Sequence, residues 1–348
     1  MTMVANIDMD IKKYRMMIEG NPGDAGAHKD LGLAYGMKGL YAEAIGELKE
    51  AVRLAPDNAD AHYSLGLTYD VAERMDEAIA EYRTTIRLAP GLAGAHLALA
   101  TALVDTGMAE DALPEFNALL QQDPDNVNVR LGFGLALAAA GYRDDAIETF
   151  REALKREPKS FDAHVFLGGA YADRGDLVEA VSEYKAAIAL NQRSPDAYYN
   201  LAVTLAEKGQ AAEAISYYRK ALEHDPEMLE ARYNLGLLLE AKGYLDEAIA
   251  EYKAALKIDP DFAEGYNRIG LALLRKGNQG EAIVAFRATI EKNREFAEPH
   301  YNLGMLYLDE KKYDDAIAEL EKAIEIDPGY LEAQNSLVTA RDRKQARQ

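Results

Sequence analysis

Apolar and small residues recur along this chain with a period of 34 residues, and polar residues fill the positions between them. Residues 233–260 and 301–328 show the period most clearly, because they are nearly the same sequence and begin 68 residues apart. Eight of the 11 prolines keep the same phase: Pro22, Pro56, Pro90, Pro124, Pro158, Pro226, Pro260 and Pro328. A fixed period of this size indicates an array of stacked repeats rather than separate globular domains.

Each 34-residue repeat, counted from Ala25, contains two helical patterns separated by a helix-breaking residue. In the first pattern the seventh, eighth and eleventh places are apolar or small, as in Leu235, Gly236 and Leu239. The second pattern starts at the twentieth place and runs to the proline, which ends that helix. The breaker suits a helix end with left-handed backbone, and it is usually glycine: Gly39, Gly107, Gly141, Gly175, Gly209, Gly243 and Gly277. Every repeat is therefore predicted to be helix, tight turn, helix, turn.

Small and large side chains occupy fixed places in the repeats. The eighth place is never larger than alanine, and the twentieth place is alanine in all nine repeats. The twenty-fourth place is large and apolar or aromatic: Leu48, Tyr82, Phe116, Phe150, Tyr184, Tyr218, Tyr252, Phe286 and Leu320. We expect the two helices of a repeat to approach closely at the small residues, with the large side chain filling the space beside them.

These residues resemble the tetratricopeptide repeat: Leu-Gly-x-x-Tyr, then Ala, then Tyr or Phe, then Ala, then Pro, at 34-residue spacing. The resemblance covers residues 25–330 as nine tandem repeats; residues 1–24 look like the second helix of a partial repeat, and residues 331–348 look like a capping helix. It implies an all-α fold, a right-handed superhelical α–α solenoid of helix-turn-helix repeats. It also implies that the first helices line the concave side, where ligands bind across the second, fifth, sixth, ninth, twelfth and thirteenth places.

Net charge narrows the classes of partner. The formal net charge of −20 argues against nucleic acid and disfavours anionic membrane surfaces, since both call for a basic face. Part of the acidity has a structural explanation, because the nineteenth place is acidic in all nine repeats. A carboxylate there lies in the first turn of the second helix, where the helix dipole favours it. The alternative explanation of the acidic charge is that the protein binds a basic protein partner.

The sequence shows no targeting or membrane signal. Its start, MTMVANIDMDIKKYRMMIEG, lacks the apolar core of a signal peptide, and no stretch approaches 18 uninterrupted apolar residues. We therefore expect a cytoplasmic protein without direct membrane insertion. The absence of cysteine excludes disulfides and thiolate metal sites.

The sequence offers little for catalysis. Five of the six histidines occupy the fourth place of a repeat: His28, His62, His96, His164 and His300. One side chain per repeat cannot easily converge on a single zinc ion, so we expect these histidines to pack and predict no metal site. No phosphate-binding loop of the form GxxxxGK[ST] and no Gly-x-Ser-x-Gly elbow occurs. We predict no enzyme activity, no catalytic residue and no cofactor.

The fifth and sixth places supply the candidate peptide-binding groove. Its residues are Tyr63, Leu97, Leu131, Tyr199, Asn200, Tyr233, Asn234, Arg268, Tyr301 and Asn302. Residues 93–175 form a smooth apolar zone, whereas the C-terminal half carries a ladder of tyrosine and asparagine. Amides at regular steps can bind the main chain of an extended peptide, and tyrosines add stacking area. The same residues are common in the family, so a purely structural role stays open.

We predict a non-enzymatic protein–protein interaction scaffold that binds a peptide or helix segment of a partner protein in the concave groove. The carboxylate clamp that the family uses for chaperone tails is absent, because Leu33 and Ser64 stand where it needs asparagine. Two alternatives stay open. The chain is similar to the substrate-binding portion of an O-linked glycosyltransferase-type enzyme without its catalytic domain, and an exposed terminal repeat would also suit a self-assembling homo-oligomer.

Overall fold

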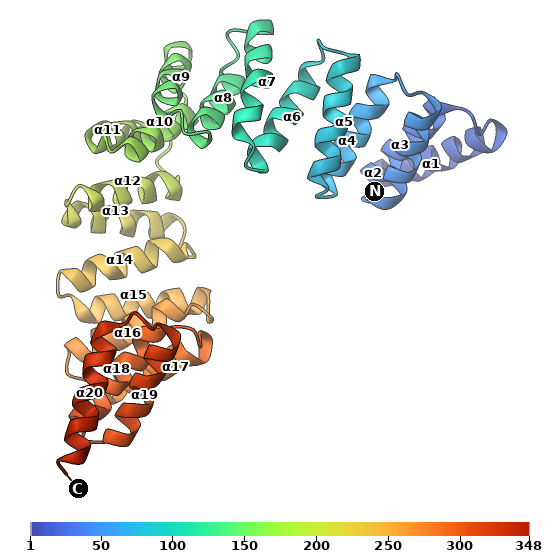
Figure 1. Cartoon of the computed structure of the whole chain (residues 1–348). Helices are drawn as coiled ribbons and strands as arrows, with labels where there is room; N and C mark the ends of the chain where they lie inside the picture. The colour runs from blue at the N-terminus through green and yellow to red at the C-terminus, as the bar shows by residue number, and fades with distance from the viewer. Residues whose placement is uncertain (1, 348) are drawn as a thin grey trace. The chain divides into compact units, whose positions relative to one another are not determined.

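The computed structural model describes residues 2–347, with side chains for residues 7–347, and consists of helices joined by short turns (Figure 1). The described residues form twenty helices and no strand. The helices are α1 (Thr2–Gly20), α2 (Ala25–Met37), α3 (Tyr41–Leu54), α4 (Ala59–Val71), α5 (Met75–Leu88), α6 (Ala93–Asp105), α7 (Ala109–Gln122), α8 (Val127–Ala139), α9 (Arg143–Arg156), α10 (Phe161–Arg174), α11 (Leu177–Leu190), α12 (Pro195–Glu207), α13 (Ala211–His224), α14 (Leu229–Ala241), α15 (Leu245–Ile258), α16 (Ala263–Arg275), α17 (Gln279–Lys292), α18 (Ala297–Asp309), α19 (Tyr313–Ile326) and α20 (Leu331–Gln345).

The helices alternate between the two predicted kinds. Even-numbered helices from α2 to α18 are the first helices of repeats, and odd-numbered helices from α3 to α19 are the second helices. In the repeats before and after the one that contains α11, a first helix packs on the second helix of its own repeat, and a second helix packs on the next first helix, as in α4, α5 and α6. This arrangement confirms the predicted all-α fold of stacked helix-turn-helix repeats.

The chain divides into two compact units, Met1–Glu183 and Tyr184–Gln348, with the boundary inside α11. We call them the N-terminal unit and the C-terminal unit. In the N-terminal unit α1 packs on α2, and in the C-terminal unit α20 packs on α19 and contacts α18. The assignment of residues 1–24 to a partial repeat, 25–330 to nine repeats and 331–348 to a cap stays a prediction, and Met1 and Gln348 lie outside the described residues.

Side-chain caps explain where several first helices begin. Asp24, Asn58 and Ser194 each accept a hydrogen bond from the backbone N–H three residues further along, at 3.0, 3.1 and 3.3 Å. These bonds satisfy donors that a helix start leaves free. Pro195 follows Ser194 at the first position of α12, where the missing N–H of proline costs nothing.

The turn inside each repeat depends on one residue with left-handed backbone. The seven breaker glycines have φ between 77° and 90°, as the sequence predicted. Glu73 and Lys311 hold the same place in two other repeats, with φ of 58° and 59°. A side chain is disfavoured in this conformation because Cβ crowds the following carbonyl oxygen.

Within a repeat the two helices meet where a glycine backbone lies against a ring. A Cβ atom added to Gly236 would lie 2.5 Å from the ring of Tyr252, and one added to Gly134 would lie 2.4 Å from the ring of Phe150. No side chain fits in that space, so the helices approach closely, as predicted from the eighth and twenty-fourth places.

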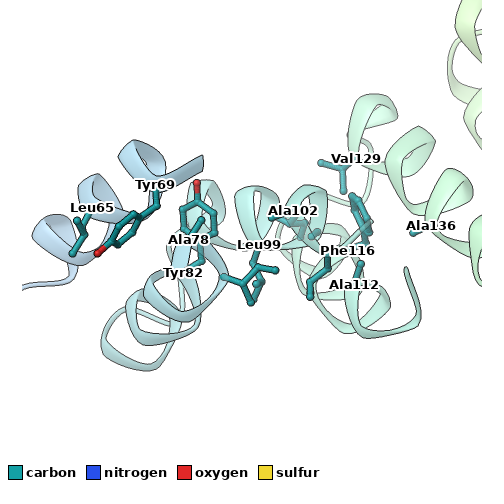
Figure 2. Packing of buried hydrophobic residues seen from close by; sticks show 14 of the residues in the cluster. Leu65, Tyr69, Ala78, Tyr82, Leu99, Ala102, Ala112, Phe116, Val129 and Ala136 are labelled. Atoms are coloured by element: carbon teal, nitrogen blue, oxygen red, sulfur yellow. The ribbon is translucent and has the colours of Figure 1, made fainter. Parts of the chain in front are cut away.

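The resulting core runs continuously through neighbouring repeats. Figure 2 shows it in the N-terminal unit from α4 to α8, where Leu65, Tyr82, Leu99 and Phe116 belong to one buried cluster. The rings of the second helices alternate with alanine and leucine side chains of the first helices (Figure 2). Because each repeat shares this core with both neighbours, no repeat buries its apolar face alone.

The fourth-place histidines connect three parts of the chain. In the second repeat, Nδ1 of His62 lies 2.6 Å from the carboxylate of Glu81 on the second helix. Its Nε2 lies 2.9 Å from the carbonyl oxygen of Pro56 in the preceding turn. The contact with a glutamate nineteen residues further on is also made by His28, His96, His164 and His300. The predicted packing role is therefore incomplete, because the ring also joins its repeat to the preceding turn.

Other side chains at the fourth place make equivalent contacts. Arg232 donates from Nη1 to Glu251 at 3.0 Å and from Nε to the carbonyl of the proline six residues earlier at 2.9 Å. Tyr266 and Gln334 also donate to the carbonyl of the proline six residues earlier. Among the described residues, no three side chains of the metal-binding types gather closely enough to hold an ion.

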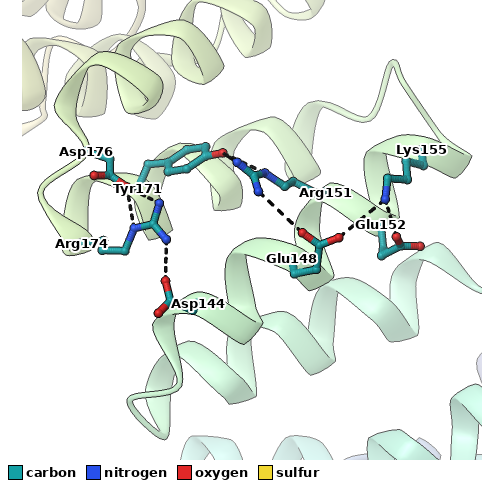
Figure 3. Close-up of polar contacts among 8 residues, drawn as sticks. All are labelled: Asp144, Glu148, Arg151, Glu152, Lys155, Tyr171, Arg174 and Asp176. Atoms are coloured by element: carbon teal, nitrogen blue, oxygen red, sulfur yellow. Dashed lines mark hydrogen bonds and ion pairs between the residues drawn. The ribbon is translucent and has the colours of Figure 1, made fainter.

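A second set of polar contacts joins successive repeats at the protein surface (Figure 3). Arg174 of α10 pairs with Asp144 of the preceding repeat and with Asp176, and Arg151 of α9 donates from Nη2 to the hydroxyl of Tyr171 at 2.6 Å. Cation–carboxylate pairs at the same two places are Lys38–Asp8, Lys276–Asp246 and Lys344–Asp314. These pairs are largely exposed to solvent, so each contributes little to stability.

The fourth repeat lacks the glutamate of this arrangement. Arg130 donates from Nη2 to the carbonyl of Pro124 at 2.6 Å, but Thr149 stands where the histidine-containing repeats have glutamate. The Nε atom of Arg130 is buried without a hydrogen-bond partner, and burial lowers the pKa of this guanidinium. Thr149, together with Phe133, also lines a cavity of about 440 Å³.

Replacing Lys311 by glycine is expected to stabilise the protein. The change removes a Cβ atom from left-handed backbone, at a gain of up to about 1 kcal/mol in the free energy of unfolding. Thermal unfolding followed by circular dichroism measures it. Gly243→Ala, at φ 83° in another repeat, is the control, and it should lower the free energy of unfolding. Equal or lower stability of Lys311→Gly would contradict the assigned strain.

Thr149→Glu is expected to raise stability by about 1 kcal/mol, because it places a carboxylate beside the unpaired Nε of Arg130. The pair would reproduce the contact of Arg232 with Glu251. Urea unfolding of wild type and variant measures the change. Thr149→Gln is the matched control without charge, and the idea fails if glutamate is no more stabilising than glutamine.

Candidate functional site

The first helices form the inner face of each compact unit. Neighbouring first helices contact each other, namely α2 with α4, α4 with α6, α6 with α8, α8 with α10, and α18 with α20. In the described part of the chain no comparable contact joins two second helices. In the N-terminal unit the repeats therefore pack more tightly on the side of the first helices, and the exposed side chains there lie on the inner side of the stack. In the C-terminal unit such a contact joins α18 and α20, and we assign the inner face of its other first helices by their equivalent places in the repeat.

The predicted tyrosines of the C-terminal unit are half-buried on this inner face. Tyr199 on α12 and Tyr233 on α14 each pack against a tyrosine ring of the second helix behind them, Tyr218 and Tyr252, at centroid distances of 5.9 and 6.0 Å. Tyr301 on α18 packs instead against Tyr330, in the turn before α20, at 5.0 Å. One side of each ring is thus covered by its own repeat, while the remaining surface is accessible. Both roles weighed for these residues, structural and ligand-binding, are compatible with this placement.

The predicted asparagines do not form a uniform ladder. Asn234 donates from Nδ2 to the hydroxyl of Tyr199 at 3.2 Å and so links α14 to α12. Asn200 is half-buried on α12, and the Nδ2 atom of Asn302 is buried without a hydrogen-bond partner. Asn267 takes the place of a tyrosine; it is only 2% exposed and donates to Glu298 at 2.8 Å. Amide groups here contribute to contacts between helices as well as to the inner face.

Arg268 belongs to a polar network and is not a free cation. Burial alone would lower the pKa of Arg268, but its hydrogen bond with Tyr233 and the carboxylate of Glu240 raise that pKa above its ordinary value. Glu240 also accepts from the hydroxyl of Tyr252 at 2.9 Å and from Nη1 of Arg275 at 3.2 Å. The carboxylate of Glu240 therefore offsets part of the charge of Arg268 and Arg275, which weakens the attraction of Arg268 for an acidic ligand.

A row of carboxylates at the second place was missed as a site by sequence reasoning. It runs along the first helices of the C-terminal unit: Asp196, Glu230, Glu264, Glu298 and Glu332. Burial and the carboxylate of Glu230 raise the pKa of Tyr199, and burial and the carboxylate of Glu298 raise that of Tyr330 to about 12. These carboxylates therefore lie close to the inner tyrosines, and the tyrosines stay neutral donors. The sequence did contain the information needed to find this row, because an acidic residue occupies the second place in five successive first helices.

The predicted residues of the N-terminal unit have three different environments. Tyr63 is half-buried, with its ring 6.1 Å from that of Tyr82. Leu97 is 45% exposed on α6, whereas Leu131 is only 6% exposed on α8. Little of the Leu131 side chain can therefore contact a ligand, and the backbone of the next residue, Gly132, lies close to the ring of Phe116.

Models of the tetratricopeptide repeat match residues 29–93, 199–261 and 297–330, and also the overlapping segments 72–131 and 103–164. A further TPR repeat model matches residues 168–209. Together these matches cover well over half of the chain. The comparison with curated proteins returns no match.

Solved structures of repeat proteins are similar to this chain. The crystal structure of MamA shares 30% identity at a TM-score of 0.45, covering 47% of this chain and 96% of that chain. YrrB, described as a TPR protein with an unusual peptide-binding site, shares 23% identity at a TM-score of 0.47, covering 57% and 97%. The C-terminal part of a TPR repeat-containing protein from Cytophaga hutchinsonii shares 18% identity at a TM-score of 0.61, covering 68% and 98%, and shows the same fold. No helix in the described residues is both long and apolar enough to cross a membrane.

Proposed function

The chain belongs to the tetratricopeptide repeat family, and from that premise we propose that it is a non-enzymatic scaffold that binds a segment of a partner protein along its inner face. The observation that carries the proposal is the inner face of the C-terminal unit. Accessible tyrosine, asparagine and carboxylate side chains recur there from one first helix to the next. A repeating surface of this kind suits a ligand that runs along the stack.

The charge of this face favours a basic segment. Five carboxylates line the second places of α12, α14, α16, α18 and α20, and Glu240 offsets part of the charge of Arg268 and Arg275. Lysine or arginine side chains of a partner would find carboxylates and tyrosine rings together, which suits both ion pairing and cation–π contact. The helix dipole also favours acids in a first turn, so structure and binding both benefit from them.

Self-assembly is a second candidate, favoured by α1. This helix packs on α2 with one side, while Met9, Met16 and Met17 are exposed on the other. Unbranched methionine side chains adapt to varied apolar partners. A second copy that covers this face would explain the exposure of three large apolar residues on a single helix.

Charge reversal on the inner face is expected to abolish partner capture. Glu230→Lys/Glu264→Lys changes two exposed carboxylates of the row, and Glu223→Lys/Glu291→Lys makes the same charge change on the second helices α13 and α17. Affinity capture from native lysate with quantitative mass spectrometry should show about a tenfold loss of a specific partner for the first variant only. Equal capture by both variants would place the binding site elsewhere.

Sedimentation velocity tests self-assembly. If α1 mediates it, wild type should sediment as a larger species with rising concentration, and Met9→Glu/Met16→Glu should remain monomeric because two new charges occupy the apolar face. Circular dichroism confirms that the variant is folded. A wild-type monomer at all concentrations would remove this candidate.

A further inference from the structure

The inner face of the N-terminal unit carries an apolar patch that the sequence analysis did not assign. We define the patch as Leu33, Met37, Tyr41, Leu67 and Val71, which are 41%, 77%, 37%, 39% and 59% exposed. They surround an open cavity of about 280 Å³ between α2, the start of α3, and α4. Large apolar side chains gathered in this way on a solvated surface mark an interaction site.

The geometry of the patch is that of two parallel ridges. Leu33 and Met37 lie four residues apart on α2, and Leu67 and Val71 lie four residues apart on α4. Residues at this spacing lie on the same face of a helix, and α2 contacts α4. The apolar character continues along the unit with the exposed side chains of Leu97 on α6 and Leu135 on α8.

The lining of this cavity offers few polar groups to the main chain of an extended peptide. Ser64 donates to the carbonyl of Asp60 at 2.7 Å and Thr68 donates to the carbonyl of Ser64 at 2.7 Å, so both hydroxyl donors are used within α4, and the Tyr41 hydroxyl is the remaining side-chain donor of the lining. An extended segment would lose hydrogen bonds to water here with little replacement. A helix satisfies its own backbone groups and presents only side chains, so a helix fits this surface.

The charges around the patch define the polar side of that helix. On α2 and α4 the carboxylates Asp30, Asp60 and Asp70 outnumber the single cation, Lys29. Lys38, just beyond α2, is paired with Asp8 at 2.5 Å. A partner helix would therefore gain from lysine or arginine beside its apolar stripe.

We propose that the patch binds an amphipathic helix of a partner protein, with apolar anchors at i, i+3 or i+4, and i+7, and with basic residues along the edges of that stripe. This rests on the proposed function, an inner face that binds a segment of a partner, and adds the conformation and chemistry of the segment for the N-terminal unit. Two ridges receive the apolar stripe between them, as in other helix-in-groove contacts.

Fluorescence anisotropy with the full chain tests the proposal. The probes are three capped, labelled helical peptides with leucine, methionine or phenylalanine as anchors and lysine along the edges. We expect saturable binding of at least one peptide. Affinity should fall at least tenfold for its glutamate-for-lysine version and for a version broken by a central proline. Absence of binding, or equal binding of the acidic or broken version, would overturn the proposal.

Variants of the protein locate the site. Met37→Asp/Val71→Asp should reduce affinity at least tenfold, whereas Val178→Asp/Val338→Asp, which changes two equally exposed valines outside the patch, should leave it unchanged. Unchanged binding by the first variant overturns the assignment to this patch. Sedimentation velocity on the same variants adds a further criterion, since a change of oligomeric state with Met37→Asp/Val71→Asp would make a second copy the occupant and overturn the proposal.

The two proposals fail independently. The capture experiment with Glu230→Lys/Glu264→Lys reports on the C-terminal unit and needs no synthetic peptide. If capture through that unit holds while every helical peptide fails, only the inference about the patch is lost. If the peptides bind the patch while capture is unaffected by the carboxylate variant, the proposed site in the C-terminal unit is lost instead.

Discussion

The contact between a small residue of the first helix and the large side chain of the second helix sets the geometry on which everything else depends. At Gly134 and Gly236 an added Cβ atom would lie 2.4–2.5 Å from a ring of the second helix, so the two backbones approach as closely as they can. Because this contact returns every 34 residues, successive repeats have nearly the same internal shape. Nearly identical repeats stack into an array, and in the N-terminal unit the apolar core continues from one repeat to the next.

Hydrogen bonds and ion pairs fix the orientation of helices that apolar contacts hold together. Apolar contacts fix how far apart helices lie, but they tolerate sliding and rotation better than hydrogen bonds do. His62 holds the second helix of its repeat through Glu81 and the preceding turn through the carbonyl of Pro56. The pair of Arg151 with Tyr171 adds a contact between successive repeats at the surface. These residues stabilise the stacking and leave the inner face free to vary.

The exposed side chains of the inner face can differ from repeat to repeat without disturbing the packing of the helices. This explains why the two units carry chemically different surfaces. The C-terminal unit presents carboxylates and half-buried tyrosines, whereas the N-terminal unit presents Leu33, Met37, Leu67 and Val71 around an open cavity. Neither surface takes part in the contacts between small residue and ring. Changes at these places therefore alter binding chemistry with little cost in stability, which is the property that a family of interaction scaffolds requires.

Periodicity in the sequence was sufficient for the helices and their turns, because these features depend on residues within a few places of each other. The left-handed glycines and the position of Tyr233 followed from that local pattern. The side of each repeat that faces inward was inferred from the resemblance to the tetratricopeptide repeat. The availability of each inner side chain depended instead on neighbours 20 to 35 residues away, as in the bonds of Arg151 to Tyr171 and of Asn234 to Tyr199. Leu97 and Leu131 hold the same place in the repeat, yet one is exposed and the other buried. Burial is a property of packed helices, so only the folded chain decides which residues remain available to a partner.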